Sequence, residues 1–142
     1  MNDQIGHLSL EQAHTRLAVP LPGRPSTISA AEYALRLERA RRLMRDAGVD
    51  ALLVTAGVSL RWFTGIGWGA SERLVALLLM QKGEPLLIAP KFEEGSLDTV
   101  LKISADKCLW EEHEAPHALV AKAMRARGAR TLALDPEAAF RI

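Results

Sequence analysis

The spacing of apolar and polar residues first becomes regular over residues 29–48. Apolar side chains recur there every three or four positions, which is typical of an amphipathic helix. Ser29 and Glu32 are spaced as a capping box at its start, and Gly48 provides a C-terminal stop. We therefore predict a helix over this segment. The predicted apolar face consists of Tyr33, Leu37, Ala40, Met44 and Ala47.

Short apolar runs without helical spacing predict the strands of a sheet. Residues 49–55 form one such run. Residues 73–80 and 85–90 form two more, separated by a turn at Gly83, and this arrangement predicts a β-hairpin. The remaining predicted strands lie at residues 107–110 and 130–135.

Further helices alternate with these strands. Residues 116–129 predict a helix with Pro116 at its first position and Gly128 at its end. Residues 91–104 are ambiguous and fit a weak helix that is interrupted by Gly95. Alternation of helices and strands predicts an α/β fold in which a mixed sheet is flanked by helices.

The N-terminal residues 1–28 are expected to form an extension outside the domain, which we assign to residues 29–142. A short helix is predicted within residues 8–17, where Ser9 is the N-cap and Gln12 its capping-box partner. An extended linker follows, because each proline removes a backbone donor and disfavours helix in the residue before it. Its prolines are Pro20, Pro22 and Pro25.

The chain stops at residues 136–142, directly after a predicted strand and where a helix would begin. Parallel strands need cover on both faces of the sheet. We therefore expect that Ile142 is not the natural end of the gene product.

Composition indicates an ordinary soluble globular domain and argues against several classes of protein. Of the 142 residues, 49% are apolar and 25% charged, and 18 Lys and Arg balance 17 Asp and Glu. This balance gives no basic footprint for nucleic acid, and the arginines of the first helix alternate with acidic residues as on a solvated face. Cys108 is the single cysteine, so no internal disulfide forms. Neither a membrane span nor a secretory leader is evident, and we expect a cytoplasmic protein.

A glycine-rich stretch, WFTGIGWGASERL at residues 62–74, is the first candidate for chemistry. A dinucleotide-binding loop needs the spacing G-x-G-x-x-G and a helix after it. Here the third glycine is misplaced and a predicted strand follows, so we interpret the stretch as a turn that allows close backbone approach. Trp68 at its centre either packs on the domain or is presented to a partner, and the residues alone favour neither.

No self-contained catalytic set is found by inspection of the remaining reactive residues. His113 and His117 are four residues apart, but Pro116 starts a helix between them and keeps them off one helical face. Cys108 lies in an apolar strand, the setting of an inert thiol. We therefore assign no catalytic and no metal-binding residue to this chain.

Four motifs in order and at matching spacing resemble the N-terminal domain of the creatinase/prolidase/aminopeptidase P family. They are an arginine-rich helix that ends in glycine, a "dallv" strand, a "TG" turn after an aromatic pair, and a hairpin with a "dGep" bend. The resemblance extends over about residues 29–135. The motifs occupy Arg36–Gly48, Asp50–Val54, Leu60–Gly65 and Lys82–Pro85.

This resemblance implies a ribonuclease H-like α/β domain that precedes a "pita-bread" metallopeptidase domain. The whole protein would be a metal-dependent hydrolase that cleaves the bond before proline in short peptides. Two divalent metal ions would be held by two Asp, one His and two Glu of the C-terminal domain, which this chain lacks. The N-terminal domain would contact its own catalytic domain, build a homodimer or tetramer and narrow access to the active site.

The resemblance also implies a role for the loop after the "TG" turn, which in this family reaches the catalytic cleft of a neighbouring subunit. The matching residues here are Trp68 and Arg73, followed by Ser71. Trp62 and Phe63 correspond to the aromatic pair and are expected in the core. Two other functions compete with this one: a non-catalytic binding or scaffold module that has kept the fold, and a free-standing α/β enzyme acting on small molecules.

Overall fold

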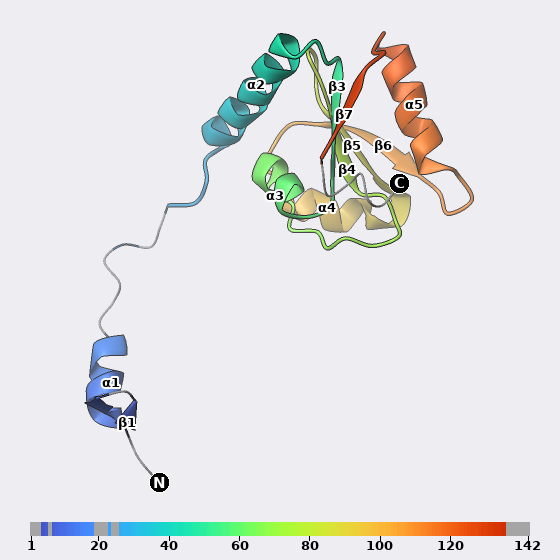
Figure 1. Cartoon of the computed structure of the whole chain (residues 1–142). Coiled ribbons are helices and arrows are strands. Elements are labelled where there is room, and N and C mark those ends of the chain that lie inside the picture. The colour runs from blue at the N-terminus through green and yellow to red at the C-terminus, as the bar shows by residue number, and fades with distance from the viewer. Residues whose placement is uncertain (1–3, 6, 19–22, 24–25, 136–142) are drawn as a thin grey trace.

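The computed structural model describes residues 4–5, 7–18, 23 and 26–135, and Figure 1 shows a small N-terminal unit apart from an α/β domain. The N-terminal unit contains two short antiparallel strands and a helix. The predicted capping box is confirmed, since the Ser9 hydroxyl accepts a bond from the Gln12 N–H (3.2 Å) and the Gln12 side chain accepts one from the Ser9 N–H (3.0 Å). These elements are β1 (Gln4–Ile5), β2 (Leu8–Ser9) and α1 (Leu10–Leu17).

The domain is built on a five-stranded mixed sheet, which confirms the predicted fold class. Its strand order is β6-β5-β4-β3-β7. The central strand β4 pairs antiparallel with both neighbours, while β5 with β6 and β3 with β7 are parallel pairs. Four strands therefore run in one direction and β4 runs against them. The strands are β3 (Ala51–Thr55), β4 (Ala76–Met80), β5 (Leu86–Pro90), β6 (Asp106–Trp110) and β7 (Leu132–Leu134).

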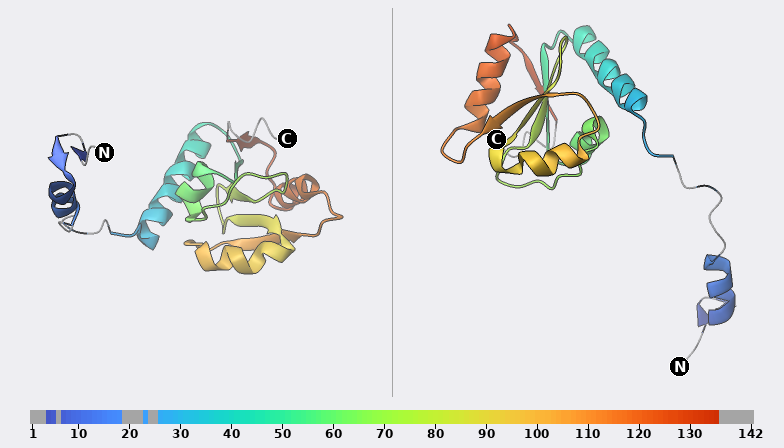
Figure 2. Two further views of the ribbon diagram at one scale, coloured as in Figure 1. Left: turned by 90° about the horizontal axis from the view of Figure 1, so that it is seen from below. Right: turned by 180° about the vertical axis from the view of Figure 1, so that it is seen from behind.

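Helices cover the two faces of the sheet unequally. Three helices pack on one face, with a short 3-10 turn at Lys91–Glu93 beside them, and a single helix packs on the other. Figures 1 and 2 show the strands standing between α2 and α5. The helices are α2 (Ala30–Asp46), α3 (Val58–Thr64) and α4 (Glu94–Val100) on one face and α5 (Pro116–Ala126) on the other.

Burial of β4 on both faces explains its unbroken apolar sequence. Successive side chains of a strand point to opposite faces. Leu77 and Leu79 accordingly join the core under α2 to α4, whereas Leu78 joins the core under α5, and all three are fully buried. Apolar alternation is absent from this strand because neither of its faces meets water.

The first long helix, α2, forms as predicted with one difference at its start. The Ser29 hydroxyl accepts a hydrogen bond from the Glu32 N–H at 3.2 Å. The Glu32 carboxylate does not return the bond to Ser29. It accepts one from Arg36 Nε at 3.1 Å, one helical turn later, so only half of the capping box is present.

Several predicted boundaries are corrected by the structure. The strand predicted over residues 49–55 begins at Ala51, because the Asp50 carboxylate instead accepts backbone N–H bonds from Arg130 (2.8 Å) and Thr131 (3.0 Å). These bonds lower the pKa of Asp50. The helix predicted to break at Gly95 runs through that residue, and a short helix that was not predicted, α3, precedes the glycine-rich turn.

The edge of the sheet formed by β7 is short and only partly covered. The edge strand β7 has three residues, and Leu132 and Leu134 are each 37% exposed. Residues 136–142, where we expected a helix to begin, lie outside the described residues. Within the described ranges, no helix combines the length and the apolar character that crossing a bilayer requires.

Gly65 ends α3 in a backbone conformation that other residues adopt at a cost. Its φ is 81°, and its N–H donates to the Arg61 carbonyl at 2.9 Å. A methyl group at this position would also collide with the side chain of Lys102. The neighbouring Thr64 is buried, and its hydroxyl donates to the Leu60 carbonyl at 2.7 Å. The start of the glycine-rich loop is therefore fixed.

We predict that Gly65→Ala lowers the free energy of unfolding by about 1–3 kcal/mol, because alanine disfavours a positive φ. Gly69→Ala is the matched control, since Gly69 has no positive φ and open space around it, and a change below about 0.5 kcal/mol is expected. Urea unfolding of both variants measures the difference. Equal losses in the two variants would contradict this account of the turn.

Candidate functional site

The direction of β4 creates the candidate site. The strands β3, β5 and β6 all end at one edge of the sheet, and β4 begins there. The loop that leads into β4, residues 65–75, therefore meets the segments that follow β5 and β6. Ligands of α/β sheets commonly bind outside the carboxyl ends of the parallel strands. We call this region, formed by residues 65–75, 91–93 and 111–114, the carboxyl edge.

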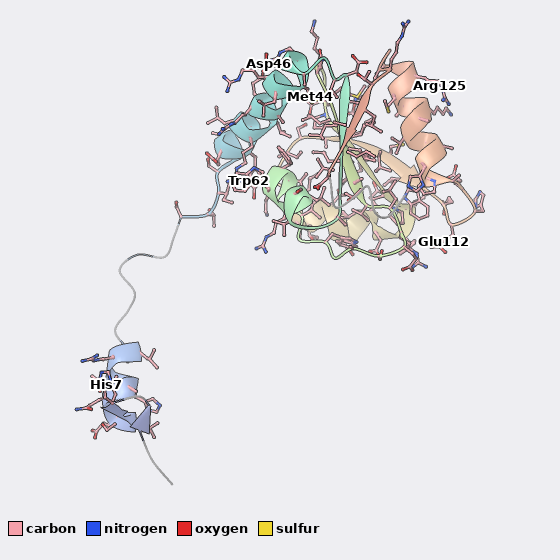
Figure 3. All side chains as sticks on the ribbon, viewed as in Figure 1. His7, Met44, Asp46, Trp62, Glu112 and Arg125 are labelled. Atoms are coloured by element: carbon pink, nitrogen blue, oxygen red, sulfur yellow. The ribbon has the colours of Figure 1, made fainter. Side chains whose placement is uncertain are left out.

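Arg73 is the central charged group of the carboxyl edge. Its Nε donates to Glu112 at 2.7 Å, and its Nη1 donates to Glu72 at 2.9 Å. The guanidinium also lies 5.6 Å from the ring centre of Phe92, which follows β5. Figure 3 labels Glu112 at this side of the domain. Three segments that are distant in sequence thus converge on one arginine.

The electrostatics of this group follow from the same contacts. The hydrogen bond and charge of Arg73 lower the pKa of Glu112, and Glu112 in turn raises the pKa of Arg73. Both side chains are accessible to solvent, with exposed fractions of 42% for Arg73 and 59% for Glu112. Ion pairs this exposed contribute little to stability because water and salt screen them. Arg73 can therefore exchange one carboxylate partner for another at little energetic cost.

Ser71 and Trp68 serve the shape of the loop. The Ser71 hydroxyl accepts a hydrogen bond from the Arg73 N–H at 3.2 Å, which forms a local turn. Trp68 is half-buried and packs against the core under α2 to α4. The loop is held at its far end by Trp110, whose Nε1 donates to the Leu74 carbonyl at 3.0 Å. All three contacts fix the position from which Arg73 projects.

The cavity under this loop is too small for a peptide. It measures about 50 Å³ and has residues of β3, the loop and α5 around it. A space of this size holds one or a few water molecules. The carboxyl edge is therefore a surface that can contact a ligand held elsewhere. The polar residues that line the cavity are Thr55, Ser71, Glu72, Arg73 and His117.

Other reactive residues are not brought together. His113 lies in the turn before α5 and His117 in its first turn, so the predicted separation of the two by Pro116 is confirmed. Burial raises the pKa of the Cys108 thiol, which keeps it protonated and unreactive. In the part of the chain that the structure describes, no group of three His, Cys, Asp or Glu side chains could hold a metal ion.

Trp62 lies on the surface, and its prediction as a core residue is wrong. Its side chain is 53% exposed, and the Arg36 guanidinium stacks 3.7 Å from its ring centre. Arg36 also donates to the Trp62 carbonyl at 2.8 Å, which ties α2 to α3. Phe63, by contrast, is partly buried against the core. Figure 3 shows Trp62 on α3 beside α2.

The position of Trp62 could have been found from the spacing of its neighbours. Leu60 and Thr64 are four residues apart and both are buried, so they define the inner face of a short helix. Trp62 lies two residues from each and therefore on the outer face. The signal was missed because the glycines on both sides favoured a turn.

The ion pair of Arg73 leads to a prediction about pH. A carboxylate whose folded-state pKa is lowered adds stability above its unfolded pKa, and this contribution is lost as the pH falls through the folded pKa. We expect NMR titration of the side-chain carboxyl carbons to show the pKa of Glu112 rising toward its ordinary value in Arg73→Ala. The pKa of Glu38 serves as the control, because Arg45 lowers it and Arg73 does not contact it. An unchanged Glu112 titration would show that the pair is absent in solution.

The five-stranded mixed sheet with helices on both faces and Arg73 at its carboxyl edge defines the class of this chain as an α/β domain. Sequence comparison supplies the family. Residues 36–141 match the Creatinase/Prolidase N-terminal domain, and the chain belongs to this family. The resemblance drawn from the four motifs is thereby confirmed.

Relatives of known structure or name agree with this placement. The chain is 30% identical over 105 residues to the probable dipeptidase PepE of Mycobacterium tuberculosis, a match that covers 72% of this chain and 28% of the relative. The crystal structure of dipeptidase PepE from Mycobacterium ulcerans is similar at 32% identity with a TM-score of 0.60, covering 72% of this chain and 28% of that one. The N-terminal domain of Xaa-Pro dipeptidase from Lactobacillus brevis shares the fold at 20% identity and a TM-score of 0.64, covering 70% and 75%.

Proposed function

We propose that this chain is the N-terminal domain of a metal-dependent peptidase that cleaves the bond before proline in short peptides. In this proposal the domain joins subunits into a homodimer or tetramer and narrows access to the catalytic cleft. Family membership supports it, together with relatives named dipeptidases. The chain spans 28% of the length of these relatives, so the catalytic domain of the proposed enzyme would lie outside it. We place the protein in the cytoplasm.

The position and bonding of Arg73 carry the proposed role in substrate selection. The side chain projects from a loop that is fixed at both ends, and it already binds two carboxylates, those of Glu72 and Glu112. A short peptide ends in a carboxylate, and arginine binds this group through paired N–H donors. When a substrate binds, its terminal carboxylate would replace the carboxylate of Glu112 or Glu72 as the partner of Arg73. The old and new partners are chemically similar.

Trp68 provides the wall in this proposal. Its ring is partly buried in the domain, which gives it a fixed orientation, and the exposed part stands on the same loop as Arg73 and Ser71. A rigid aromatic side chain at the mouth of a cleft excludes long peptides. In an assembly with two-fold symmetry, a loop of one subunit can serve the cleft of the other.

The chemistry of hydrolysis is assigned to the catalytic domain. Two divalent metal ions in that domain would supply the activated water and polarise the scissile carbonyl. Within the described residues of this chain, no side-chain cluster could ligate them. In this proposal, Arg73 positions the substrate by its carboxylate, and Trp68 excludes long peptides from the cleft.

We predict that Trp68→Ala and Arg73→Ala, each in the full-length enzyme, lower the turnover of Xaa-Pro substrates without unfolding the protein. Removal of one charge-assisted carboxylate contact should reduce kcat/KM by about tenfold or more. Arg125→Ala is the control, because Arg125 is an exposed arginine on α5, away from the loop. Steady-state kinetics and a circular dichroism melt test both points. Kinetics that are unchanged in both loop variants would refute the gating role.

The isolated chain should hydrolyse no peptide in the presence of any divalent metal ion. The reason is that its described residues hold no metal cluster and the cavity at the carboxyl edge is too small for a peptide. A chromatographic assay with proline dipeptides and added Mn²⁺, Co²⁺ or Zn²⁺ measures this. Peptidase activity that persists through purification to constant specific activity would contradict the proposal that hydrolysis takes place only in the catalytic domain.

A further inference from the structure

The outward side of α2 carries exposed apolar side chains beside a groove. Leu35 is 68% and Leu43 59% exposed, although the other side of the same helix is buried on the sheet. Trp62 of α3 lies next to them and is 53% exposed. These three residues line a groove of about 480 Å³ between the two helices. Isolated exposed leucines are ordinary, but apolar side chains gathered around one groove mark a contact surface.

Charged and apolar residues alternate along this side of α2. They recur every three or four positions and therefore lie on one face of the helix. In chain order they are Glu32, Leu35, Arg39 and Leu43, all of them exposed, and we call them the outer stripe. Among the described residues, the Arg39 side chain has no ion-pair partner, whereas the Glu32 carboxylate binds Arg36 Nε at 3.1 Å.

We infer that α2 of one chain packs antiparallel on α2 of a second copy, about a two-fold axis that passes between Leu35 and Arg36. This inference rests on the proposed function only for the expectation that subunits associate, and it names the surface through which they do so. A two-fold axis brings the same surface of both subunits together, so that surface must complement itself. The outer stripe meets this requirement.

The axis pairs each residue with one that lies equally far away on the other side. Glu32 and Arg39 are each about 5 Å from the axis along the helix, so Glu32 faces Arg39 of the partner subunit. Leu35 is next to the axis and contacts the partner's Leu35. At either end, Leu43 faces the partner's Ile28, which precedes the helix and is 48% exposed. Two pairs of opposite charge thus flank a central apolar contact.

Charge argues against the other simple arrangements. Parallel packing about a two-fold axis would place Glu32 beside the partner's Glu32 and Arg39 beside the partner's Arg39. An antiparallel pair centred on Arg39 would match Leu35 with Leu43. It would also bring the two Arg39 side chains together and put Glu32 beside the partner's Asp46. Like charges placed together in an interface cost free energy, and the inferred pair avoids both conflicts.

Arg36 adjoins the axis without bringing like charges into the contact. Its side chain is 10% exposed, because its guanidinium stacks 3.7 Å from the ring centre of Trp62. It also donates to the Glu32 carboxylate and to the Trp62 carbonyl. The charge of Arg36 is therefore already partnered within its own chain.

The symmetry of the outer stripe favours a second copy as the occupant of this surface. Another partner, such as the proposed catalytic domain, would bind Glu32 and Arg39 through its own charges wherever these two residues lay. It would not need them on either side of a central leucine, whereas a two-fold dimer does. A second copy therefore accounts for the positions of the charged residues as well as for their signs.

Charge reversal tests this pairing. Glu32→Arg and Arg39→Glu should each weaken self-association of the 15.5 kDa chain by about tenfold or more, because each variant alone creates two pairs of like charge. An equimolar mixture of the two variants should associate again, since both pairs of the mixed dimer have opposite charges. Sedimentation equilibrium measures this up to about 1 mM chain, because an interface of one helix per subunit is small.

Arg125→Glu is the control for charge reversal, because Arg125 is exposed on α5, on the other face of the sheet. It should leave association unchanged, and circular dichroism melts establish that every variant folds. A mixture that associates no better than its components would overturn the inference, as would a wild-type chain that stays monomeric. Association that neither single variant weakens would place the contact on another surface and leave the proposed joining of subunits intact.

Cysteine cross-linking locates the axis. In a Cys108→Ala background, oxidised Leu35→Cys should form a disulfide between two copies, because the side chain nearest the axis meets its own counterpart. Arg125→Cys in the same background should stay unlinked. A Leu35→Cys chain that remains monomeric would overturn the inference, which is the result expected if α1 or the catalytic domain covers this surface. The kinetic test of the gating role is independent, since its two residues, Trp68 and Arg73, lie outside α2.

Discussion

The burial of β4 on both faces is the constraint on which the rest of this domain depends. A central strand made of five buried residues needs apolar cover above and below, which α2 to α4 and α5 supply. Because β4 also runs against its four companions, the loop that leads into it must arrive at the edge where β3, β5 and β6 end. Arg73 lies at this edge because it belongs to the loop that leads into β4, and β4 runs antiparallel to the other strands.

The carboxyl edge offers an electrostatic contact. Arg73 forms ion pairs with Glu72 and Glu112, and all three side chains are exposed, so these pairs contribute little to stability. An arginine whose present partners are held this weakly suits the proposed contact with a substrate that arrives and leaves.

Much of the fold was predictable because its signals are local and strong. The apolar spacing of α2, the capping box at Ser9 and the hairpin turn at Gly83 all correspond to elements in the structure. The failures share one cause, which is that tertiary contacts override local preference. Gly95 continues α4 although glycine is a poor helix former, and α3 forms between two glycines because Leu60 and Thr64 are drawn into the core. The exposed position of Trp62 follows from the same helix, because Leu60 and Thr64 turn toward the core and Trp62 lies two residues from each. The roles of Trp68, Arg73 and Ser71 remain predictions.

The loop between Gly65 and Leu74 is anchored at both ends by groups that lie outside it. The Lys102 N–H donates to the Thr64 carbonyl at 2.8 Å at one end, and Trp110 holds the Leu74 carbonyl at the other. Between these anchors, Ile66 is fully buried in the core under α2 to α4, and Trp68 packs against that core. The exposed positions between these anchors, among them Gly67, Gly69 and Ala70, can therefore change without a loss of folding. Under the proposed function, substrate preference would diverge at these positions while the sheet and helices are inherited unchanged.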